Sequence, residues 1–260
     1  MIFHENIVIK KFGNSDEFII ICDHSSNYIP DDYKKLGVSD EYLESHRAYD
    51  LGVSHLAKEL SQLLDCHLVM ANFSRLLIDP NRGEDDPTLI PKISEGEIIS
   101  GNLDVKFSVK DKERNRRIRE YYVPYHNQIN DLINAAIQNN KVPKIISIHS
   151  FTPVWKGKGR DIEVGILWDK DDRLSQIFLK SLKSKKTADN KPYNGRLKND
   201  TMFKHGTSRG LPHVLIELRQ DLLNNKKDRL LWAKKIYNVL KDNEKIIKMF
   251  TIKNYGSNTI

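Results

Sequence analysis

Four short apolar runs, each ending in residues capable of chemistry, constrain the fold of this chain most strongly. A short run of Ile, Leu and Val bounded by turn residues predicts a buried strand of a parallel sheet. Open sheets of this kind bind ligands at the carboxyl ends of their strands. The runs therefore predict an α/β protein with a functional site at one edge of the sheet. They are FIIICDHSSN (18–27), LLIDPNR (76–82), KIISIHSFTP (144–153) and HVLIELRQD (213–221).

The remaining pattern completes a three-layer α/β fold, with a mixed, mostly parallel sheet and helices on both faces. We expect the long helix to bend near Pro124. The stretch 83–104 lacks periodicity and is expected to form a lid or rim, and 184–208 a long loop with a short strand. No repeat or linker divides the chain, so we expect a single domain over 1–260. A strand at 6–12 is expected to pair with the run at 18–22 around a turn at Gly13-Asn14-Ser15. Further strands are expected at 67–74 and 161–168, and helices at 40–47, 50–64, 108–139, 173–183 and 229–247.

The composition bears on whether the protein binds nucleic acid and on the cellular compartment in which it is found. The net charge of +7 raises the possibility of nucleic acid, and the stretch 111–120 (DKERNRRIRE) carries part of it. This stretch is either a solvated helix face or a surface that attracts an anionic substrate. No nucleic-acid motif accompanies it, so we expect no nucleic-acid partner. The apolar runs are too short to span a membrane, the N-terminus lacks a signal-peptide layout, and Cys22 and Cys66 suggest buried thiols. We expect a cytoplasmic protein.

Two histidines at strand ends suggest a metal site. His24 and His149 both follow apolar runs, where a neutral imidazole is well placed as a zinc ligand or a general base. A histidine such as His24, taken alone, is more often a hydrogen-bonded structural residue. Asp50 lies near the start of the expected helix 50–64, so it is either a helix cap, or a metal ligand or hydrogen-bonding partner of His24.

Charged residues near the same edge suggest catalytic and substrate-binding roles. Glu217 interrupts an apolar strand, where it needs a partner: either Arg219 on the same strand face, or a metal or bound water. As a general base it could take a proton from water activated by a metal. Arg75 and Arg82 form a candidate anion clamp, with surface salt bridging as the alternative. His126 lies in an aromatic cluster that is either core packing or part of a binding site.

These blocks resemble the N-formylglutamate amidohydrolase family in their order and spacing, from about residue 18 to 240. The resemblance implies the phosphorylase/hydrolase-like fold of the zinc-dependent exopeptidases. Within it, IDPNR is similar to the Asp-x-Asn-Arg substrate motif of zinc carboxypeptidases, and IELRQ to their Glu-Leu-Arg motif. The matching blocks are ICDHSSNYIP, HRAYDLG, NFSRLLIDPNR, IHSFTP with Arg160 behind it, NKPY and LPHVLIELRQDL.

The resemblance implies roles for individual residues. One zinc ion would be held by His24 and His149. Glu217 would be the general base and Arg75 the oxyanion-stabilising residue. Zinc carboxypeptidases take a further ligand from a Glu three residues after the first His; here that position is Asn27, a poor ligand, and Asp50 is the proposed replacement. The substrate-binding set would be Asn81, Arg82, Arg160, Ser150 and His126.

The expected function is hydrolysis of the amide bond of a small anionic N-acyl amino acid such as N-formylglutamate. Three alternatives remain open on the sequence: a binding protein for such molecules without catalysis, an amidase acting on peptide or cell-wall fragments, and nucleic-acid binding through 111–119. The absence of an export signal counts against the cell-wall amidase. The residues do not specify the metal, the acyl group or the oligomeric state.

Overall fold

A seven-stranded mixed sheet forms the centre of the protein in the computed structural model, which describes residues 7–11 and 15–259. Its strand order is β1-β3-β2-β6-β11-β9-β10, and the four pairs β3–β2, β2–β6, β6–β11 and β9–β10 are parallel. The strands are β1 (Ile7–Lys11), β2 (Ser15–Cys22), β3 (Cys66–Ala71), β6 (Lys144–Phe151), β9 (Val164–Leu167), β10 (Thr187–Asp189) and β11 (His213–Arg219).

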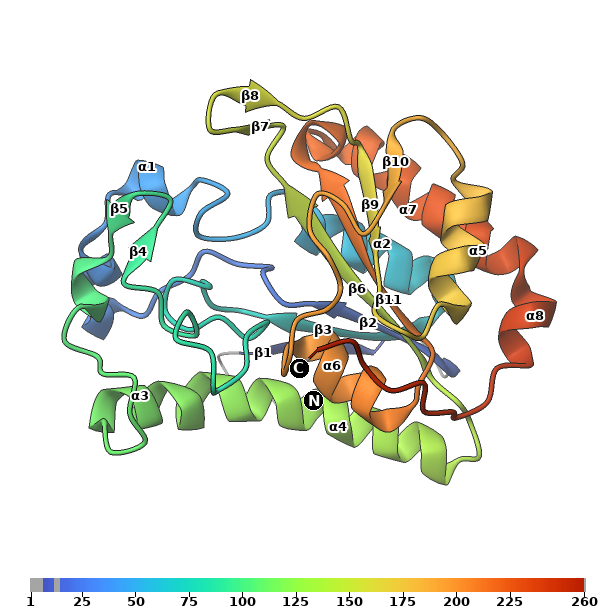
Figure 1. Cartoon of the computed structure of the whole chain (residues 1–260), viewed down its shortest axis with the longest axis horizontal. Helices are drawn as coiled ribbons and strands as arrows, with labels where there is room; N and C mark the ends of the chain where they lie inside the picture. The colour runs from blue at the N-terminus through green and yellow to red at the C-terminus, as the bar shows by residue number, and fades with distance from the viewer. Residues whose placement is uncertain (1–6, 12–14, 260) are drawn as a thin grey trace.

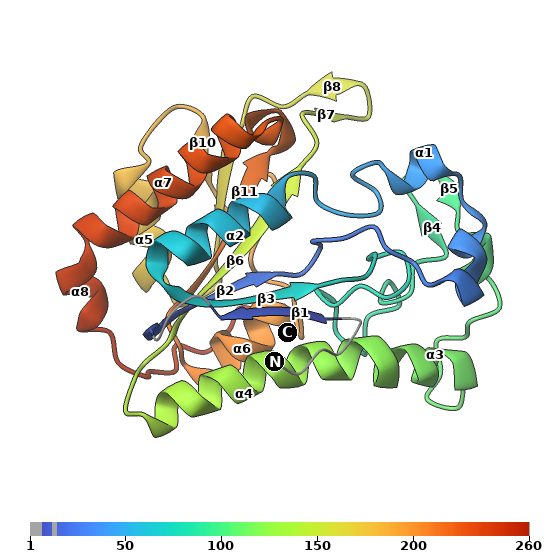
Figure 2. The same ribbon diagram turned by 180° about the vertical axis from the view of Figure 1, so that it is seen from behind.

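Helices cover both faces of this sheet (Figures 1 and 2). Alternate side chains of each strand point to opposite faces, so Ile19 and Ile21 of β2 pack toward α4, whereas Ile20 packs toward α2, α5 and α7. The predicted three-layer α/β class is confirmed. The helices are α1 (Asp40–Leu43), α2 (Val53–Leu64), α3 (Lys112–Arg117), α4 (Val123–Gln138), α5 (Arg173–Ser181), α6 (Thr201–His205), α7 (Lys226–Asp242) and α8 (Glu244–Lys248).

Three expectations about the elements need correction. Residues 76–82 form turns rather than a strand, because their backbone leaves the sheet after β3 and buries Leu76 and Leu77 from a loop. The strand at 7–11 pairs antiparallel with β3 and not with β2; residues 12–14 between β1 and β2 lie outside the described part. The loop 184–208 contains α6 in addition to the expected short strand.

The long helix has an irregular turn where a bend was expected. Residues Ile118–Tyr122 form a π turn between α3 and α4, immediately before Pro124. Proline lacks the N–H that would continue the regular hydrogen-bond ladder, so the wider turn accommodates it. Among the described residues, none of the helices combines the length and the apolar character needed to cross a membrane.

The basic stretch 111–120 mostly supports neighbouring loops. Arg117 is 1% exposed and donates to the carbonyl of Leu77 (3.0 Å) and to Asn102 Oδ1 (2.6 Å). Arg114 donates to the carbonyl of Glu84 (2.6 Å). Arg116 pairs with Asp32 (2.7 Å) and Glu120 (3.1 Å). Two of its arginines are thus buried anchors of the 76–104 region rather than members of a solvated face.

Two small hairpins project beyond the sheet, near the carboxyl ends of its central strands (Figure 1). One consists of β4 (Ile93–Ser94) and β5 (Glu97–Ile98), and the other of β7 (Val154–Trp155) and β8 (Lys158–Gly159). The first lies inside the predicted lid or rim at 83–104. Asn102 is fully buried and donates to the carbonyls of Leu76 and Pro91 (2.8 and 2.7 Å), so this connection is anchored at its base.

Candidate active site

Two histidines and an aspartate meet at the carboxyl edge of the sheet. His24 follows β2, His149 lies near the end of β6, and Asp50 precedes α2. One ligand-type atom from each residue lies within 4.8 Å of the other two, and all three side chains are buried. Because β2 and β6 are adjacent parallel strands, residues at their carboxyl ends become neighbours. The structure brings the three predicted metal ligands together.

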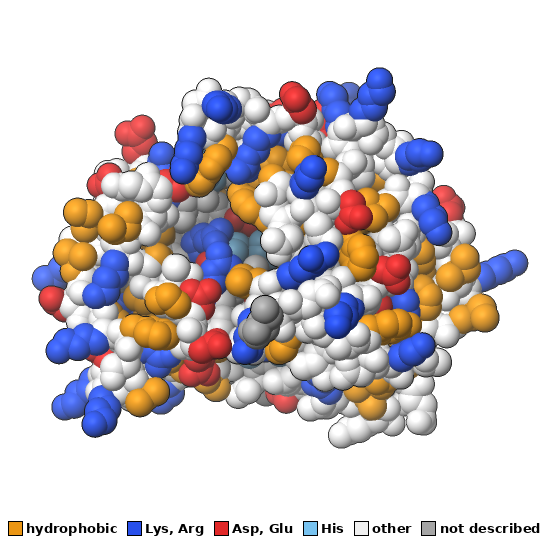
Figure 3. Space-filling view, in the orientation of Figure 1, with side chains coloured by type: hydrophobic (Ala, Val, Ile, Leu, Met, Phe, Trp, Pro, Cys, Tyr) orange, Lys and Arg blue, Asp and Glu red, His pale blue; other side chains and the backbone are white. Residues whose placement is uncertain are grey.

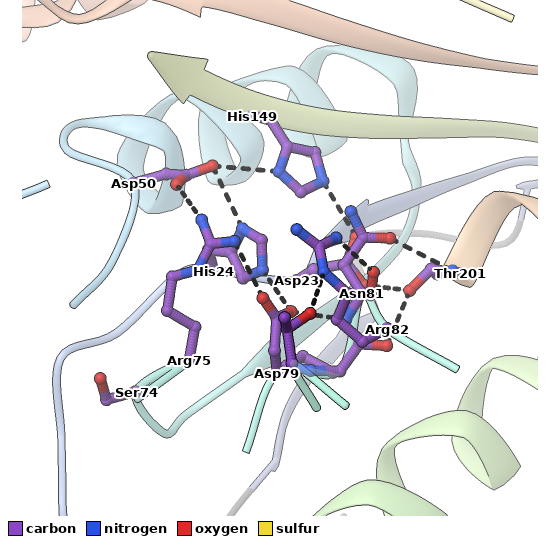
Figure 4. A network of polar contacts seen from close by, with 12 residues as sticks. Asp23, His24, Asp50, Ser74, Arg75, Asp79, Asn81, Arg82, His149 and Thr201 are labelled. Atoms are coloured by element: carbon purple, nitrogen blue, oxygen red, sulfur yellow. Dashed lines mark hydrogen bonds and ion pairs between the residues drawn. The ribbon is translucent and has the colours of Figure 1, made fainter. Parts of the chain in front are cut away.

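Each histidine turns its Nε2 atom toward a second buried carboxylate (Figure 4). His24 Nε2 lies 2.8 Å from Asp79 Oδ1, and His149 Nε2 lies 3.0 Å from Asp23 Oδ2. The Nδ1 atoms face Asp50 Oδ2, at 3.5 Å from His24 and 3.0 Å from His149. A carboxylate at Nε2 orients the ring and favours a proton there, which leaves the Nδ1 lone pair for a metal.

The electrostatics of this group favour a bound cation. His24 Nδ1 is buried and has no hydrogen-bond partner among the described residues. Burial by itself would lower the pKa of His149, but hydrogen bonds to Asp23 and Asp50 outweigh it and hold that pKa well above its usual value. The group therefore stabilises positive charge between the two rings. Two imidazole nitrogens and one carboxylate oxygen also form a donor set that zinc takes in catalytic sites, so these residues fit the ion.

The two outer carboxylates are functional candidates that the sequence analysis missed. Asp23 accepts hydrogen bonds from four side chains. Burial by itself would raise the pKa of Asp23, but the hydrogen bonds from His149 and Thr201 and the charges of His149 and His24 lower it to about 2. Asp79 accepts from the N–H of Asn81 (2.9 Å) besides binding His24. Their positions in the sequence could have indicated a role at the site, because Asp23 directly precedes His24 and Asp79 begins the DPNR motif. The four donors to Asp23 are His149 Nε2 (3.0 Å), Ser147 Oγ (3.2 Å), Tyr125 Oη (2.9 Å) and Thr201 Oγ1 (2.7 Å).

Asp50 does not cap a helix. The N-cap of α2 is Gly52, and Asp50 Oδ2 accepts the N–H of Ser150 (3.1 Å) instead. The hydroxyl of Ser150 donates to the carbonyl of Leu51 (3.0 Å), which ties β6 to the start of α2. Asn27 is turned elsewhere, with its side-chain amide donating to the carbonyl of Leu43 (3.1 Å). The chain thus places Asp50, and not Asn27, beside the two histidines.

Glu217 stands next to the histidine pair. It occupies the strand position paired with His149 in adjacent parallel strands, so both side chains lie on the same face of the sheet. Burial raises the pKa of Glu217 to about 7, and its Oε2 atom has no hydrogen-bond partner among the described residues. A Glu217–Arg219 pair does not form; Arg219 binds Asp221 (2.7 Å) and Glu163 (3.6 Å). Glu217 is therefore a buried carboxylate free to act on a ligand.

The residues of the expected anion clamp line the same cavity. Arg75 is held by Asp79 at 2.8 Å and lies 3.7 Å from Asp50. Arg82 lies 3.8 Å from Asp86, and its Nη1 donates to the carbonyl of Asn81 (3.0 Å). Both guanidinium groups are thus positioned by carboxylates or carbonyls around the group of His24, Asp50 and His149.

A cavity of about 730 Å³ opens over these residues. In the space-filling view it is a hollow with histidine and arginine or lysine side chains at its floor (Figure 3). Its floor includes His24, Asp50, His149 and Glu217, and its outer wall includes Trp155 and Tyr193. A concave site with convergent polar groups and a carboxyl of perturbed pKa is the arrangement expected of an active site.

Two of the predicted substrate-binding residues do not line the cavity directly. Arg160 lies behind its outer wall, where its guanidinium donates to the Tyr193 hydroxyl (3.2 Å). His126 is buried beneath the site; its ring nitrogens contact His205 Nε2 (2.8 Å) and the carbonyl of Pro80 (3.1 Å). Burial lowers the pKa of His126 to about 4. His126 supports the DPNR turn from below and is not brought to the cavity.

Comparison with known proteins places this geometry in a family. Residues 16–224 match the N-formylglutamate amidohydrolase family. The crystal structure of gene product Atu2144 from Agrobacterium tumefaciens is 32% identical, with a TM-score of 0.87 over 93% of this chain and 96% of that one. N-formylglutamate amidohydrolase from Ralstonia eutropha JMP134 is 20% identical and shares the fold, with a TM-score of 0.63 over 93% and 98%. No curated protein matches the chain.

The fold and the family match together define an enzyme that hydrolyses linear amides, an amidohydrolase. The chain belongs to the N-formylglutamate amidohydrolase family, as the match over residues 16–224 shows.

Proposed function

We propose that this protein hydrolyses the amide bond of an N-acyl acidic amino acid, with N-formylglutamate as the first substrate to test. The proposed metal site is His24, Asp50 and His149, and zinc is the proposed ion. One observation carries the proposal: among the described residues, neither His24 Nδ1, which is buried beside Asp50 and His149, nor Glu217 Oε2, in the neighbouring strand position, has a hydrogen-bond partner. This arrangement suits metal-assisted hydrolysis better than binding alone.

A zinc ion bound there would polarise the amide carbonyl and make water more acidic. Glu217 would accept a proton from the attacking water and deliver it to the amide nitrogen as the C–N bond breaks. The water oxygen forms the new bond to the acyl carbon, so the products are a carboxylic acid and a free amino acid. The raised pKa of Glu217 suits a group that both takes and gives a proton near neutral pH.

Arginines and an asparagine would position the substrate. Arg75 lies 3.7 Å from Asp50, close enough to the metal-binding group for its guanidinium to stabilise negative charge on the carbonyl oxygen. Asn81 and Arg82 would hold the carboxylate of the amino acid, because a guanidinium fork matches a carboxylate. Ser150 would act through its backbone, whose N–H fixes Asp50.

The test combines metal content with turnover. Protein purified without chelator should carry close to one zinc per chain and release glutamate from N-formylglutamate. His149→Ala should lose both the metal and the activity, while His46→Ala, at the rim of the cavity, should keep the metal. Wild-type protein that binds no metal when zinc is supplied, and hydrolyses no N-acyl amino acid, would refute the proposal.

A further inference from the structure

Arg196 differs from the other arginines that line the cavity. It reaches the cavity from the loop between β10 and α6, where it is exposed. Within the described part of the chain, no carboxylate forms an ion pair with it, and its guanidinium donates no hydrogen bond. A positive charge of this kind in a cavity wall attracts an anionic ligand. The other lining arginines each have an acidic neighbour: Arg47 has Glu95 (3.1 Å), Arg75 has Asp79 (2.8 Å) and Arg82 has Asp86 (3.8 Å).

The backbone that carries Arg196 is fixed against the end of β9. Asn190 Oδ1 accepts hydrogen bonds from the N–H groups of Gly195 (2.9 Å) and Trp168 (3.1 Å), which joins the loop to the residue that follows β9. A Cβ atom on Gly195 would lie 2.4 Å from the backbone nitrogen of Trp168, so glycine is needed for this close approach. Arg196 therefore extends from an anchored backbone, and only its side chain has to move to meet a ligand.

The same loop also lies against the segment 79–86, which contains the residues proposed to bind the substrate carboxylate. Asn199 is three residues after Arg196, so the Cα atoms of these two residues are at most roughly 11 Å apart. Two contacts join the loop to the segment: the N–H of Thr201 donates to Asn81 Oδ1 (3.2 Å), and Asn199 Nδ2 donates to both carboxylate oxygens of Asp85 (3.0 and 2.9 Å). These contacts hold Arg196 on the side of the cavity formed by that segment.

A turn inside the loop supports this placement. The N–H of Asp200 donates to the carbonyl of Leu197 (3.4 Å), so the residue next to Arg196 lies beside the buried Asp200. Burial raises the pKa of Asp200 to about 7, and the positive charge of Arg82 is among the effects that oppose this rise. Asp200 is therefore close to Arg82 as well as to the neighbour of Arg196. The two arginines thus belong to one side of the cavity.

A dicarboxylic amino acid needs a second cation close to the first. Its two carboxylates are only a few bonds apart, so a main-chain carboxylate held by Asn81 and Arg82 keeps the side-chain carboxylate on the same side. Arg75 is already bound by a carboxylate beside the histidine pair, and Arg47 by one on the β4–β5 hairpin. Arg196 is the lining arginine that remains for the side chain, and its planar guanidinium matches a carboxylate.

We propose that Arg196 binds the side-chain carboxylate of the amino acid, and that it selects glutamate over the neutral analogue glutamine. The inference rests on the proposed function and extends it from the main chain of the amino acid to its side chain. Arg196 would touch the substrate at a distance from the bond that breaks. Its interaction would be equal in the bound substrate and in the transition state, so its loss should raise KM and leave kcat unchanged.

The experiment compares N-formylglutamate with N-formylglutamine, in which an amide of the same shape replaces the side-chain carboxylate. Wild-type zinc-loaded enzyme should prefer the acid by at least about tenfold in kcat/KM, because only the acid pairs with the guanidinium. In Arg196→Gln the ratio should fall to about one, through a higher KM for the acid. Arg196→Lys keeps the charge but loses the planar fork, so its ratio should lie between.

Arg47→Gln is the matched control, because it removes a lining arginine whose charge is already paired with Glu95. Its ratio should stay at the wild-type value. Thermal unfolding of Arg196→Gln should match that of the wild type, because the exposed guanidinium contributes no printed-range contact to the fold among the described residues.

Each outcome bears on one proposal or the other. Equal kcat/KM values for the two compounds in the wild type, or a preference that survives Arg196→Gln or disappears equally in Arg47→Gln, would overturn the role of Arg196 and leave the hydrolase proposal intact. If no N-acyl amino acid is hydrolysed, the proposed function fails. Calorimetric affinities for the same two compounds then decide the inference: tighter binding of the acid that is lost in Arg196→Gln supports it, and equal affinities contradict it.

Discussion

The floor and the rim of the cavity are built in different ways. The floor, defined as His24, Asp50, His149 and Glu217, lies on or next to the sheet, and each of its side chains is at most 7% exposed. The rim, defined as the hairpins 93–98 and 154–159 with the loop 190–197, is open to solvent. There Trp155 is 37% and Tyr193 45% exposed.

The contacts that hold the two regions differ in strength. Buried carboxylates orient the floor histidines at 2.8–3.0 Å, and breaking such buried charged bonds is costly. The rim is held by partly exposed pairs, such as Glu95 with His46 and Arg47, and by the stacking of Arg160 on Trp155 and Tyr193. Each of these contacts is worth about 1 kcal/mol or less. Under the proposed function, the chemistry would depend on the rigidly held floor, and substrate selection on the more exposed rim.

The largest expected effect is on the floor. Glu217→Gln keeps the shape but removes the proton acceptor, so we expect kcat for N-formylglutamate to fall about 10²- to 10⁴-fold while zinc content stays at the wild-type level. Glu163→Gln, on a carboxylate that pairs with Lys186 away from the floor, should leave kcat unchanged. Turnover assays with metal analysis check both, and wild-type kcat in Glu217→Gln would remove the base role.

A smaller effect, on zinc affinity, is expected from Asp23, which lies behind the floor histidine His149. Asp23→Asn removes the charge that orients His149 and should weaken zinc affinity about 10- to 100-fold. Competition with a chelating dye measures this affinity without reference to activity. Asp171→Asn alters another buried aspartate, one that pairs with Arg173 (2.6 Å), and should leave zinc affinity unchanged. Equal zinc affinity in wild type and Asp23→Asn would show that His149 does not need this carboxylate.

Stability should respond to pH through Asp200, between floor and rim. Burial raises the pKa of Asp200 to about 7, above the pKa of the same group in the unfolded chain, which is about 4. The contribution of Asp200 to stability is therefore fully present below about pH 4 and is lost as the pH rises to about 7. Asp200→Asn keeps the cap on Phe203 N–H and does not ionise. It should raise the free energy of unfolding by on the order of a few kcal/mol at pH 8, but not at pH 4. Denaturant titrations at both pH values test this, and a gain independent of pH would contradict it.

The smallest effect is expected at the rim. Glu95→Gln weakens the contacts with His46 (3.0 Å) and Arg47 (3.1 Å) that join the 93–98 hairpin to the segment after α1. We expect a rise of a few-fold in KM, little change in kcat, and a loss of stability below about 1 kcal/mol. Glu97→Gln on the same hairpin is the matched control. A large fall in kcat would mean that the rim takes part in the chemistry.

The strands were the most predictable part of the fold. Apolar runs at 18–22, 144–148 and 213–216 indicated buried strands, and all three are central in the sheet. The same signal failed at 76–79, because Leu76, Leu77 and Ile78 are buried from turns rather than from a strand. Apolar content reports burial, and only backbone pairing distinguishes a strand from a buried loop.

The candidate site was predictable in its residue types and less so in its arrangement. The sequence by itself determined that His24, His149 and Glu217 lie at or near the carboxyl ends of apolar strands, because local hydrophobicity and residue order encode where strands end. Only the tertiary structure shows that Asp50 lies beside the two histidines and does not cap the helix. It also turns Asn27 away and places Asp23 and Asp79 behind the histidines. These outcomes depend on strand order and on contacts between residues 55 to 126 positions apart, which local sequence does not encode.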